Sequence, residues 1–386
     1  MEPLLLSATY RHREAIADLA LDLARKSAGF RRSLPPGLIA SLADLVRSMN
    51  CYYSNLIEGH DTHPIDIERA LKDDYSANPK QRDLQLEARA HIAVQKRIDE
   101  GAMRGGRELT PDGIREIHRE FCNLLPADLL WVEESTTKER HPVAAGELRT
   151  RDVMAGSHVA ISAAAVPRFL QRFAQGYGGT GKAESIAAIA AAHHRLLWIH
   201  PFLDGNGRVA RLVSHARLLE TLETGALWSV ARGLARNARD YKSLLANCDQ
   251  PRRHDLDGSG TLSEEALGEF TQFFLKVCID QVEFMENLMQ PGRIHARILL
   301  WTEEEIRVGG LPPRSNAILE ALLFRGELPR GDAAATAGIG DRHGRRVVAA
   351  LLKKNVLVSD GPRAPLRLAF PASLASRWMP GLFPDQ

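Results

Sequence analysis

The sequence predicts a mainly helical protein that carries a small β-hairpin and a separate C-terminal module. Apolar residues recur three and four positions apart through most of the 386 residues, which is the spacing of amphipathic helices. That spacing breaks over residues 139–162, and the composition changes at Gly309–Pro313. Hydrophobic residues make up 44% of the chain and charged residues 25%, as in an ordinary globular protein of two or three domains.

Charge and hydropathy exclude several classes of protein. A formal net charge of +2 argues against a whole-chain binder of polyanions. No apolar run approaches the roughly 18 residues that a spanning helix needs, so we expect no membrane protein. Met1–Leu6 lacks the basic start of a signal peptide. The four cysteines form no CxxC pair, which argues against a zinc site or disulfide framework and favours a cytoplasmic protein with buried thiols.

The N-terminal part is expected to be helical. Helical spacing of apolar residues covers three segments, residues 11–28, 37–55 and 83–99. Thr110 is a good N-cap and Pro111 suits the first helical position, so another helix is expected to begin there. Residues 139–162 then combine Pro, Gly and short alternating apolar stretches, which predict a small hairpin or flap.

The rest of the chain is divided on the same grounds. Helices are expected over residues 166–175, 183–199, 208–222 and 263–289. Further on, three helices (315–326, 331–337 and 341–354) precede two strands that flank Asp360–Pro362, which is the order of a winged helix. The predicted domains are an N-terminal helical region (1–105), a core (106–290), a linker (291–310) and a winged-helix-like domain (311–372).

One segment is far more specific than the rest, residues 200–211, which read HPFLDGNGRVAR. It lies between two predicted helices, and Pro201 ends the first of them. Gly205 and Gly207 permit a tight turn from which backbone N–H groups converge at the start of the second helix. Such a turn is a ready anion site, because unpaired donors and the positive end of the helix dipole face the ligand.

Four side chains of this segment suit phosphate chemistry. Arg208 and Arg211 share one face of the helix, and each can grip phosphate oxygens in a fork. Asp204 is a hard oxygen ligand for Mg²⁺ beside the anion site. His200 is the only side chain there that titrates near neutrality, so it suits a proton acceptor. Alone, each feature has a plainer interpretation (a simple turn, a helix cap, solvated arginines), but their joint occurrence favours a functional site.

The segment resembles the HPFx[D/E]GNGRxxR signature of the Fic family and matches it at every defined position. The similarity extends over about residues 40–290. It implies a mainly α fold with a Fic-type helical core and a small β-hairpin flap, here followed by the winged-helix domain. It also implies an enzyme, a protein adenylyltransferase. Such a nucleotidyltransferase takes ATP as co-substrate and transfers AMP to a Ser, Thr or Tyr hydroxyl of a target protein (AMPylation), releasing diphosphate.

The resemblance assigns a role to each residue of the turn. His200 would be the general base, and Asp204 would bind Mg²⁺. Gly205, Asn206 and Gly207 would form the anion hole. Doc-like toxins, which transfer phosphate, have lysine where this chain has Gly207, so the resemblance favours transfer of AMP.

Two further assignments follow from the resemblance. Arg208 would meet the β- and γ-phosphates of ATP, and Arg211 would meet the γ-phosphate. The family's flap, which docks the backbone of the target as an added strand, would be residues 146–161.

A second motif lies upstream of this core. Residues 54–59, SNLIEG, resemble the inhibitory [S/T]xxxE[G/N] motif of Fic proteins, with Ser54 and Glu58 at its two defined ends. The implied role of Glu58 is to pair with Arg211, so that ATP binds misaligned for in-line attack on its α-phosphorus. The plainer interpretation is a surface glutamate at the end of a helix, followed by a glycine C-cap.

Two other patterns imitate metal sites. Residues 255–266 resemble an EF-hand loop, but Ala266 stands where a bidentate Glu belongs, so we expect a turn capped by Ser263. His193 and His194 are adjacent on a predicted helix and point about 100° apart, so packing is a better interpretation than a shared metal. By analogy alone, residues 227–241 would border the base and ribose of the nucleotide.

The C-terminal domain introduces a second class of function. Residues 311–370 contain ten basic and five acidic residues. Arg342, Arg345 and Arg346 begin its third helix, which suits contacts with DNA phosphates. Winged helices also bind proteins, so both partners stay open. The alternative to an adenylyltransferase is therefore a DNA-binding regulator whose Fic core has a minor catalytic role or none. The sequence also leaves open self-modification, a homodimer, removal of AMP and the identity of the target protein.

Overall fold

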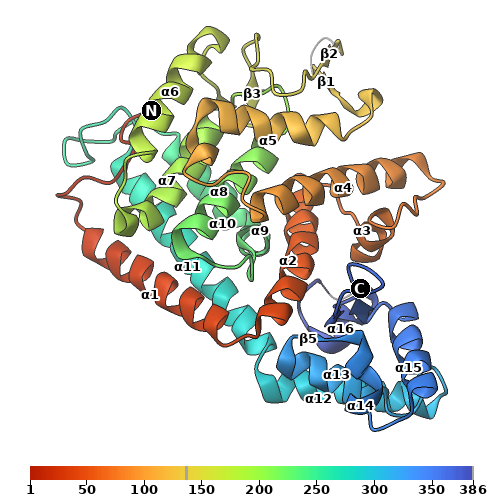
Figure 1. The fold of residues 1–386 in the computed structure, drawn as a ribbon. Coiled ribbons are helices and arrows are strands. Elements are labelled where there is room, and N and C mark those ends of the chain that lie inside the picture. Colours follow the sequence, from red (N-terminus) through yellow and green to blue (C-terminus); the bar gives the residue numbers. More distant parts are fainter. Residues whose placement is uncertain (135–137, 385–386) are drawn as a thin grey trace. The chain divides into compact units, whose positions relative to one another are not determined.

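The computed structural model describes residues 1–134 and 138–384, and helices dominate it, as the sequence predicts (Figure 1). The chain divides into two compact units. The first contains Met1–Ala28, Asn50–Thr224 and Ser229–Gln281, and the second contains Gly29–Met49, Gly225–Trp228 and the chain from Val282 onwards. The division falls within three helices, α1 (Arg13–Arg32), α2 (Pro36–Ile57) and α11 (Glu264–Leu288).

The first unit is built around α7 (Lys182–Ile199) and α8 (Asn206–Leu222), which pack against each other. Most residues of α8 are buried, and the core around it includes Leu196, Phe202 and Val209. The other helices wholly within this unit are α3 (Pro64–Ala70), α4 (Pro79–Asp99), α5 (Pro111–Asn123), α6 (Val166–Tyr177), α9 (Val230–Arg236) and α10 (Ala238–Cys248). Short 3-10 helices lie at Arg107–Leu109, Ala127–Leu129 and Ala163–Ala165.

Two short antiparallel hairpins belong to the first unit. Strand β3 (Met154–Ala155) pairs with β4 (His158–Val159), with Met154 opposite Val159, which confirms the hairpin predicted over residues 139–162. Strand β2 (Arg140–Pro142) pairs instead with β1 (Trp131–Glu133) in a separate hairpin that the sequence did not reveal.

The second unit contains the predicted C-terminal elements. The helices are α13 (Ser315–Arg325), α14 (Ala333–Thr336), α15 (Asp341–Lys353) and α16 (Ala375–Trp378), with 3-10 turns at Arg330–Asp332 and Ala372–Leu374. Strands β6 (Leu357–Val358) and β7 (Leu366–Leu368) form the predicted hairpin, and β5 (Glu327–Leu328) adds a third strand in the order β5-β7-β6. The predicted helices and hairpin are confirmed, whereas the winged-helix assignment itself stays a prediction.

The predicted linker over residues 291–310 is wrong. Most of it forms α12 (Pro291–Arg307), in which Ile294, Ile298 and Trp301 are buried. These residues are four and three positions apart, so they form one apolar stripe, and the ring of Trp301 meets that of Trp378 edge-on at 5.1 Å. The glycine–proline run that suggested a linker follows this helix.

Several smaller points complete the comparison with the sequence. Thr110 accepts a hydrogen bond from the backbone N–H of Gly113 at 3.0 Å, which confirms it as the N-cap of α5. The four cysteines are buried and unpaired, in agreement with their expected role as small core residues. Within the described part of the chain, no helix has the length and apolar character needed to cross a membrane.

Candidate active site

The turn between α7 and α8 places the predicted site residues together. His200 ends α7 with φ 51° and ψ 63°, a left-handed conformation that is unusual for a residue with a side chain, and its N–H donates to the Leu196 carbonyl at 3.1 Å. Gly205 precedes α8 with φ 78°, where glycine costs nothing. The first intrahelical bond of α8 is donated by the Val209 N–H. The N–H groups of residues 206–208 therefore point out of the helix end, as an anion site requires.

The side chain of Asn206 braces the turn. Its Oδ1 accepts from the Phe202 N–H, and its Nδ2 donates to the Phe202 carbonyl, both at 2.9 Å. The amide side chain thus closes the turn on itself. The backbone N–H of Asn206 lies at the start of α8, where the predicted anion hole would be.

Glu58 and Arg211 form the ion pair that the motif implies, between the end of α2 and the first turns of α8. Arg211 also donates through Nε to the Ser54 hydroxyl at 2.8 Å and through Nη2 to the Ser54 carbonyl at 3.3 Å. A Cβ placed on Gly207 would collide with Oε1 of Glu58. The carboxylate therefore lies directly against the predicted anion hole.

The charge state of this pair follows from its surroundings. Burial on its own would raise the pKa of Glu58, but the charge and hydrogen bond of Arg211 outweigh burial, with a smaller contribution from Arg208, and the pKa is lowered. Glu58 is therefore ionised at neutral pH, and its side chain keeps 35% of its surface exposed.

Arg208 is held by two carboxylates. Its Nη2 donates to Oδ2 of Asp204 at 2.8 Å, and its Nη1 lies 3.5 Å from Oε2 of Glu87 on α4. The guanidinium is buried and lies 4.8 Å above the ring centre of Phe121. His60, which follows the inhibitory motif, contacts Glu87 through Nδ1 at 2.8 Å. Glu87 could not be recognised from the sequence, because a lone glutamate on an amphipathic helix is ordinary.

The imidazole of His200 is neutral at physiological pH. Burial, followed by the charges of His158 and Arg149, lowers its pKa to about 4. A neutral imidazole can accept a proton from a hydroxyl group.

His118 ties the turn to the start of the predicted flap. Its ring stacks on Phe202 with centroids 3.9 Å apart, and its Nδ1 accepts from the Gly146 N–H at 2.9 Å. Burial lowers the pKa of His118 to about 4, so the ring is neutral and can accept this bond.

The patterns that imitate metal sites have other roles. His193 bonds to Ser214 and Tyr241, and His194 bonds to Asp249, so the two rings pack separately as expected. Ser263 accepts from the Ala266 N–H at 3.1 Å, which confirms the predicted cap.

The carboxylate of Asp257 in the EF-hand-like loop is used within the protein. It accepts from the Ser263 hydroxyl and from the N–H groups of Arg253 and Glu265. These three bonds give the Asp257 carboxylate a structural role in the loop.

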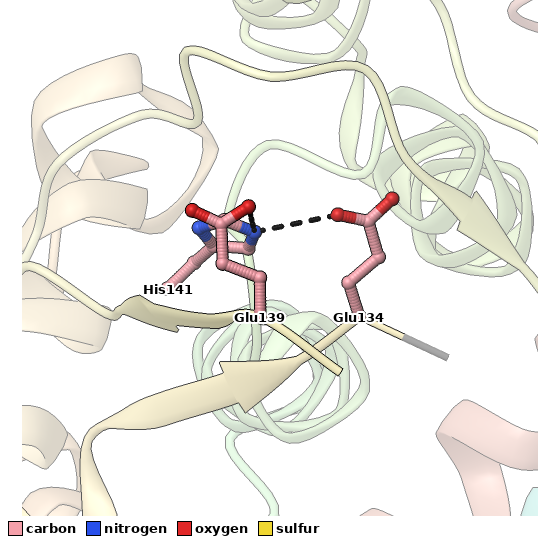
Figure 2. Close-up of side chains that lie close together, drawn as sticks. All are labelled: Glu134, Glu139 and His141. Carbon is pink, nitrogen blue, oxygen red and sulfur yellow. Dashed lines mark hydrogen bonds and ion pairs between the residues drawn. The ribbon is translucent and has the colours of Figure 1, made fainter. Parts of the chain in front are cut away.

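One further cluster has ligand-like side chains, Glu134, Glu139 and His141 beside the β1–β2 hairpin (Figure 2). His141 Nε2 lies 3.4 Å from Glu134 and 3.8 Å from Glu139. Arg151 donates to His141 Nδ1 at 2.8 Å and lies 3.6 Å from Glu134. The Arg151 guanidinium offsets part of the charge of the two carboxylates, and the four side chains form a surface ionic network.

Comparison with known proteins agrees with this geometry. Residues 108–218 match the model of the Fic/DOC family. This part of the chain is a Fic domain. The chain is 28% identical over 175 residues to the protein adenylyltransferase Fic of Nematostella vectensis and 29% identical over 126 residues to that of Drosophila yakuba. These alignments cover 44% and 32% of this chain, and 36% and 26% of those relatives. The chain thus spans about a third or less of the length of the curated relatives it matches.

Solved structures share the fold. A Fic family protein from Desulfovibrio desulfuricans aligns over 94% of this chain and 98% of its own, with a TM-score of 0.54 and 17% identity. Fic-1 from C. elegans (aa134 - 508) aligns over 73% of this chain and 76% of its own, with a TM-score of 0.52 and 15% identity.

Proposed function

We propose that this protein transfers AMP from ATP to a hydroxyl side chain of a protein, and that Glu58 holds the reaction back. The observation that carries the proposal is the contact of Glu58 with Arg211, which are 153 positions apart in the sequence. This contact joins the motif of residues 54–59 to the segment 200–211, at the N-terminus of α8, where phosphates would bind. The relatives named protein adenylyltransferase support the same chemistry.

The proposed reaction assigns a step to each part of the turn. The hydroxyl oxygen of the target attacks the α-phosphorus of ATP, the bond from that phosphorus to the diphosphate oxygen breaks, and His200 takes the hydroxyl proton. The N–H groups at the start of α8 bind the phosphate oxygens. Arg208 and Arg211 neutralise the leaving diphosphate.

Asp204 is suited to hold Mg²⁺. Its side chain is 53% exposed at the mouth of the turn, and Arg208 occupies only one of its oxygens. A carboxylate together with phosphate oxygens is the usual environment of this ion, which would offset charge on the phosphates.

Glu58 opposes this arrangement in two ways. It occupies Arg211, which is the proposed partner of the γ-phosphate, and it places a negative charge against Gly207 in the anion hole. ATP that binds around this carboxylate would present its α-phosphorus out of line with the attacking oxygen, and in-line geometry supplies much of the catalysis of phosphoryl-type transfer. We further propose that this carboxylate can orient water for removal of AMP from a modified target.

The test is the initial rate at which α-labelled AMP enters protein, at saturating ATP. A hydrogen bond between charged groups is worth about 2 kcal/mol, so Glu58→Gly should raise the rate roughly 30-fold. Glu58→Gln, which removes the charge and keeps the shape, should raise it in the same direction. The control is Glu68→Gln. Glu68 forms an ion pair with Lys72 at 2.8 Å, and this pair does not involve the turn. If folded Glu58→Gly transfers AMP no faster than the protein without this substitution, autoinhibition by Glu58 is contradicted.

A double variant that also changes Arg211 separates two explanations of a rate increase in Glu58→Gly. If Glu58 acts through Arg211, then Glu58→Gly/Arg211→Ala should be slow, because the γ-phosphate has lost Arg211, its proposed partner. A fast double variant would show that Glu58 restrains the reaction through another contact.

A second candidate function belongs to the C-terminal unit. Arg342, Arg345 and Arg346 are exposed on α15, whose opposite face is buried through Val347 and Leu351. We propose that this exposed face binds the phosphates of duplex DNA.

The measurement is fluorescence anisotropy of a labelled duplex at increasing salt. Replacing all three arginines with Gln should weaken binding and reduce the slope of log affinity against log salt by up to about 0.9 for each lost phosphate contact. The matched control replaces three exposed arginines of the first unit, Arg82, Arg104 and Arg168. Equal affinity and slope for the two triple variants would contradict the proposal.

A further inference from the structure

The helix that carries His200 ends on carbonyl groups that need partners. The last carbonyls of any α-helix lack an intrahelical donor. Here the donors come from the predicted flap. Arg149 donates through Nε to the His200 carbonyl at 2.7 Å, and its Nη2 lies 3.5 Å from the Ile199 carbonyl. The backbone N–H of Arg149 donates to the Pro201 carbonyl at 2.9 Å.

The same guanidinium closes the flap on itself. Arg149 donates to the carbonyl of Arg151 at 2.8 Å and to that of Ile161, so it holds both ends of the flap hairpin. Its side chain is fully buried. A buried cation at the C-terminal end of a helix is also favoured by the negative end of the helix dipole.

His158, on strand β4 of the flap, caps the carbonyl before these. Its Nε2 donates to the Trp198 carbonyl at 2.9 Å, and its Nδ1 lies 3.3 Å from Oδ2 of Asp249. A carbonyl and a carboxylate are both acceptors, so the ring satisfies both only when it carries two protons. Burial would lower the pKa of His158, but the bonds to Asp249 and to the Trp198 carbonyl raise it.

Four consecutive carbonyls, those of residues 198–201, are thus bound by the flap. The result matters at His200, because a left-handed backbone costs a residue with a Cβ about 1–2 kcal/mol and persists only where its surroundings hold it. The carbonyl of His200 itself is one of those held.

We propose that Arg149 and His158 are positioning residues for AMP transfer, and that the flap fixes the general base by capping α7. This inference rests on the proposed function. It adds that the flap which would dock the target also holds His200 in place. A flap that leaves its docked position releases the His200 backbone, and the reaction then lacks an aligned proton acceptor.

The first test compares turnover with nucleotide binding. In the Glu58→Gly background, Arg149→Gln should lower kcat about 10- to 100-fold, since misplacing a catalytic group by about 1 Å can cost 100-fold. The Kd for a fluorescent ATP analogue should stay within about twofold, because the anion hole lies on α8. The control is Arg140→Gln, whose guanidinium lies 3.7 Å over the ring of Trp131 and touches no α7 carbonyl. An unchanged kcat in Arg149→Gln overturns the proposal.

The second test asks whether Arg149 acts through His200. Added to His200→Ala, the Arg149→Gln change should cost nothing more, because no base is left to position. A further loss of the same factor would mean that Arg149 has an independent role, and would overturn the inference. His158→Gln can still donate one bond and provides a milder variant if Arg149→Gln does not fold. It should show the same epistasis with a smaller loss.

The third measurement does not depend on activity. Hydrogen exchange at the amides of His200, Phe202 and Leu203 should be faster in Arg149→Gln than in the parent protein and unchanged in Arg140→Gln. If Glu58→Gly transfers no AMP, the proposed function fails, while exchange still tests the capping. Equal exchange in the two arginine variants contradicts the capping itself.

Discussion

Arg208 and Arg211 lie about one helical turn apart on α8, and carboxylates from different parts of the first unit hold them. Asp204 contacts Arg208 from within the turn, and Glu87 approaches it from α4. Glu58 holds Arg211 from the end of α2. In the proposed function, nucleotide phosphates would compete with these carboxylates for the same guanidinium donors, so each ion pair would restrain the binding of the nucleotide.

Replacing His200 with Ala should abolish transfer while ATP still binds. A general base contributes about 100- to 10,000-fold, and the imidazole does not belong to the anion hole. The measurement is the rate of AMP incorporation in the Glu58→Gly background, together with the Kd for ATP. Because the pKa of His200 is lowered to about 4, its titration should leave the rate flat from about pH 6 to 8. A near-normal rate in His200→Ala would show that another group is the base.

Replacing Asp204 with Ala should remove most activity and its response to Mg²⁺. In the proposed function, the carboxylate would supply Mg²⁺ with a protein ligand, and it also orients Arg208 through the bond at 2.8 Å. The measurement is activity during titration with Mg²⁺, with Asp204→Asn as the variant that keeps the size of the side chain. A titration curve identical to that of the parent would place the metal on other ligands.

At the level of elements, the turn between α7 and α8 is held by bonds within it and by bonds from the predicted flap. The helices on either side and the sharp turn between them follow from the apolar spacing, Pro201 and the glycines. The two bonds of Asn206 with Phe202 could not be predicted, because they depend on where the backbone folds back. The same holds for Arg149, since an arginine outside any recognised motif reveals nothing about the carbonyls it will meet.

Asn206→Ala should destabilise the protein and reduce activity together. Two buried backbone groups of Phe202 lose their partners, and each unsatisfied group costs about 1–3 kcal/mol. The free energy of unfolding, measured in urea, should fall by about 2–6 kcal/mol. The comparison is Asn247→Ala at the end of α10. A loss of activity without loss of stability would instead mean that the amide contacts the nucleotide.

At the level of the whole molecule, most helices and the signature segment could be predicted, whereas the division into units could not. The sequence places a boundary at Gly309, but α12 packs as a helix through Ile298 and Trp301 and the second unit also includes residues 29–49. Long-range assembly of this kind depends on which apolar faces meet. Periodicity shows that a face exists and does not show what covers it.

Acidification should destabilise the protein as a whole, because five of its histidines have a lowered pKa and are neutral at physiological pH. The pKa is lowered, first by burial, to about 3 for His91 and His193 and to about 4 for His118, His194 and His200. Below about pH 6.5 these histidines bind protons in the unfolded chain but stay unprotonated in the folded protein. The free energy of unfolding therefore falls as pH falls, by up to about 1.4 kcal/mol per pH unit for each such histidine.

Glu108 changes the pH dependence of stability in the opposite direction, so a variant of this residue tests the prediction. Burial raises its pKa to about 7, so the folded protein holds this proton while the unfolded chain releases it above about pH 4.5. Its contribution to stability is therefore lost as pH rises towards 7 and partly offsets the histidines. Urea unfolding between pH 5 and 6.5 should show a positive slope of stability against pH. That slope should be steeper in Glu108→Gln, which lacks the opposing group, and shallower in His91→Leu, which lacks one histidine. Equal slopes in the three proteins would mean that these groups do not titrate as their burial requires.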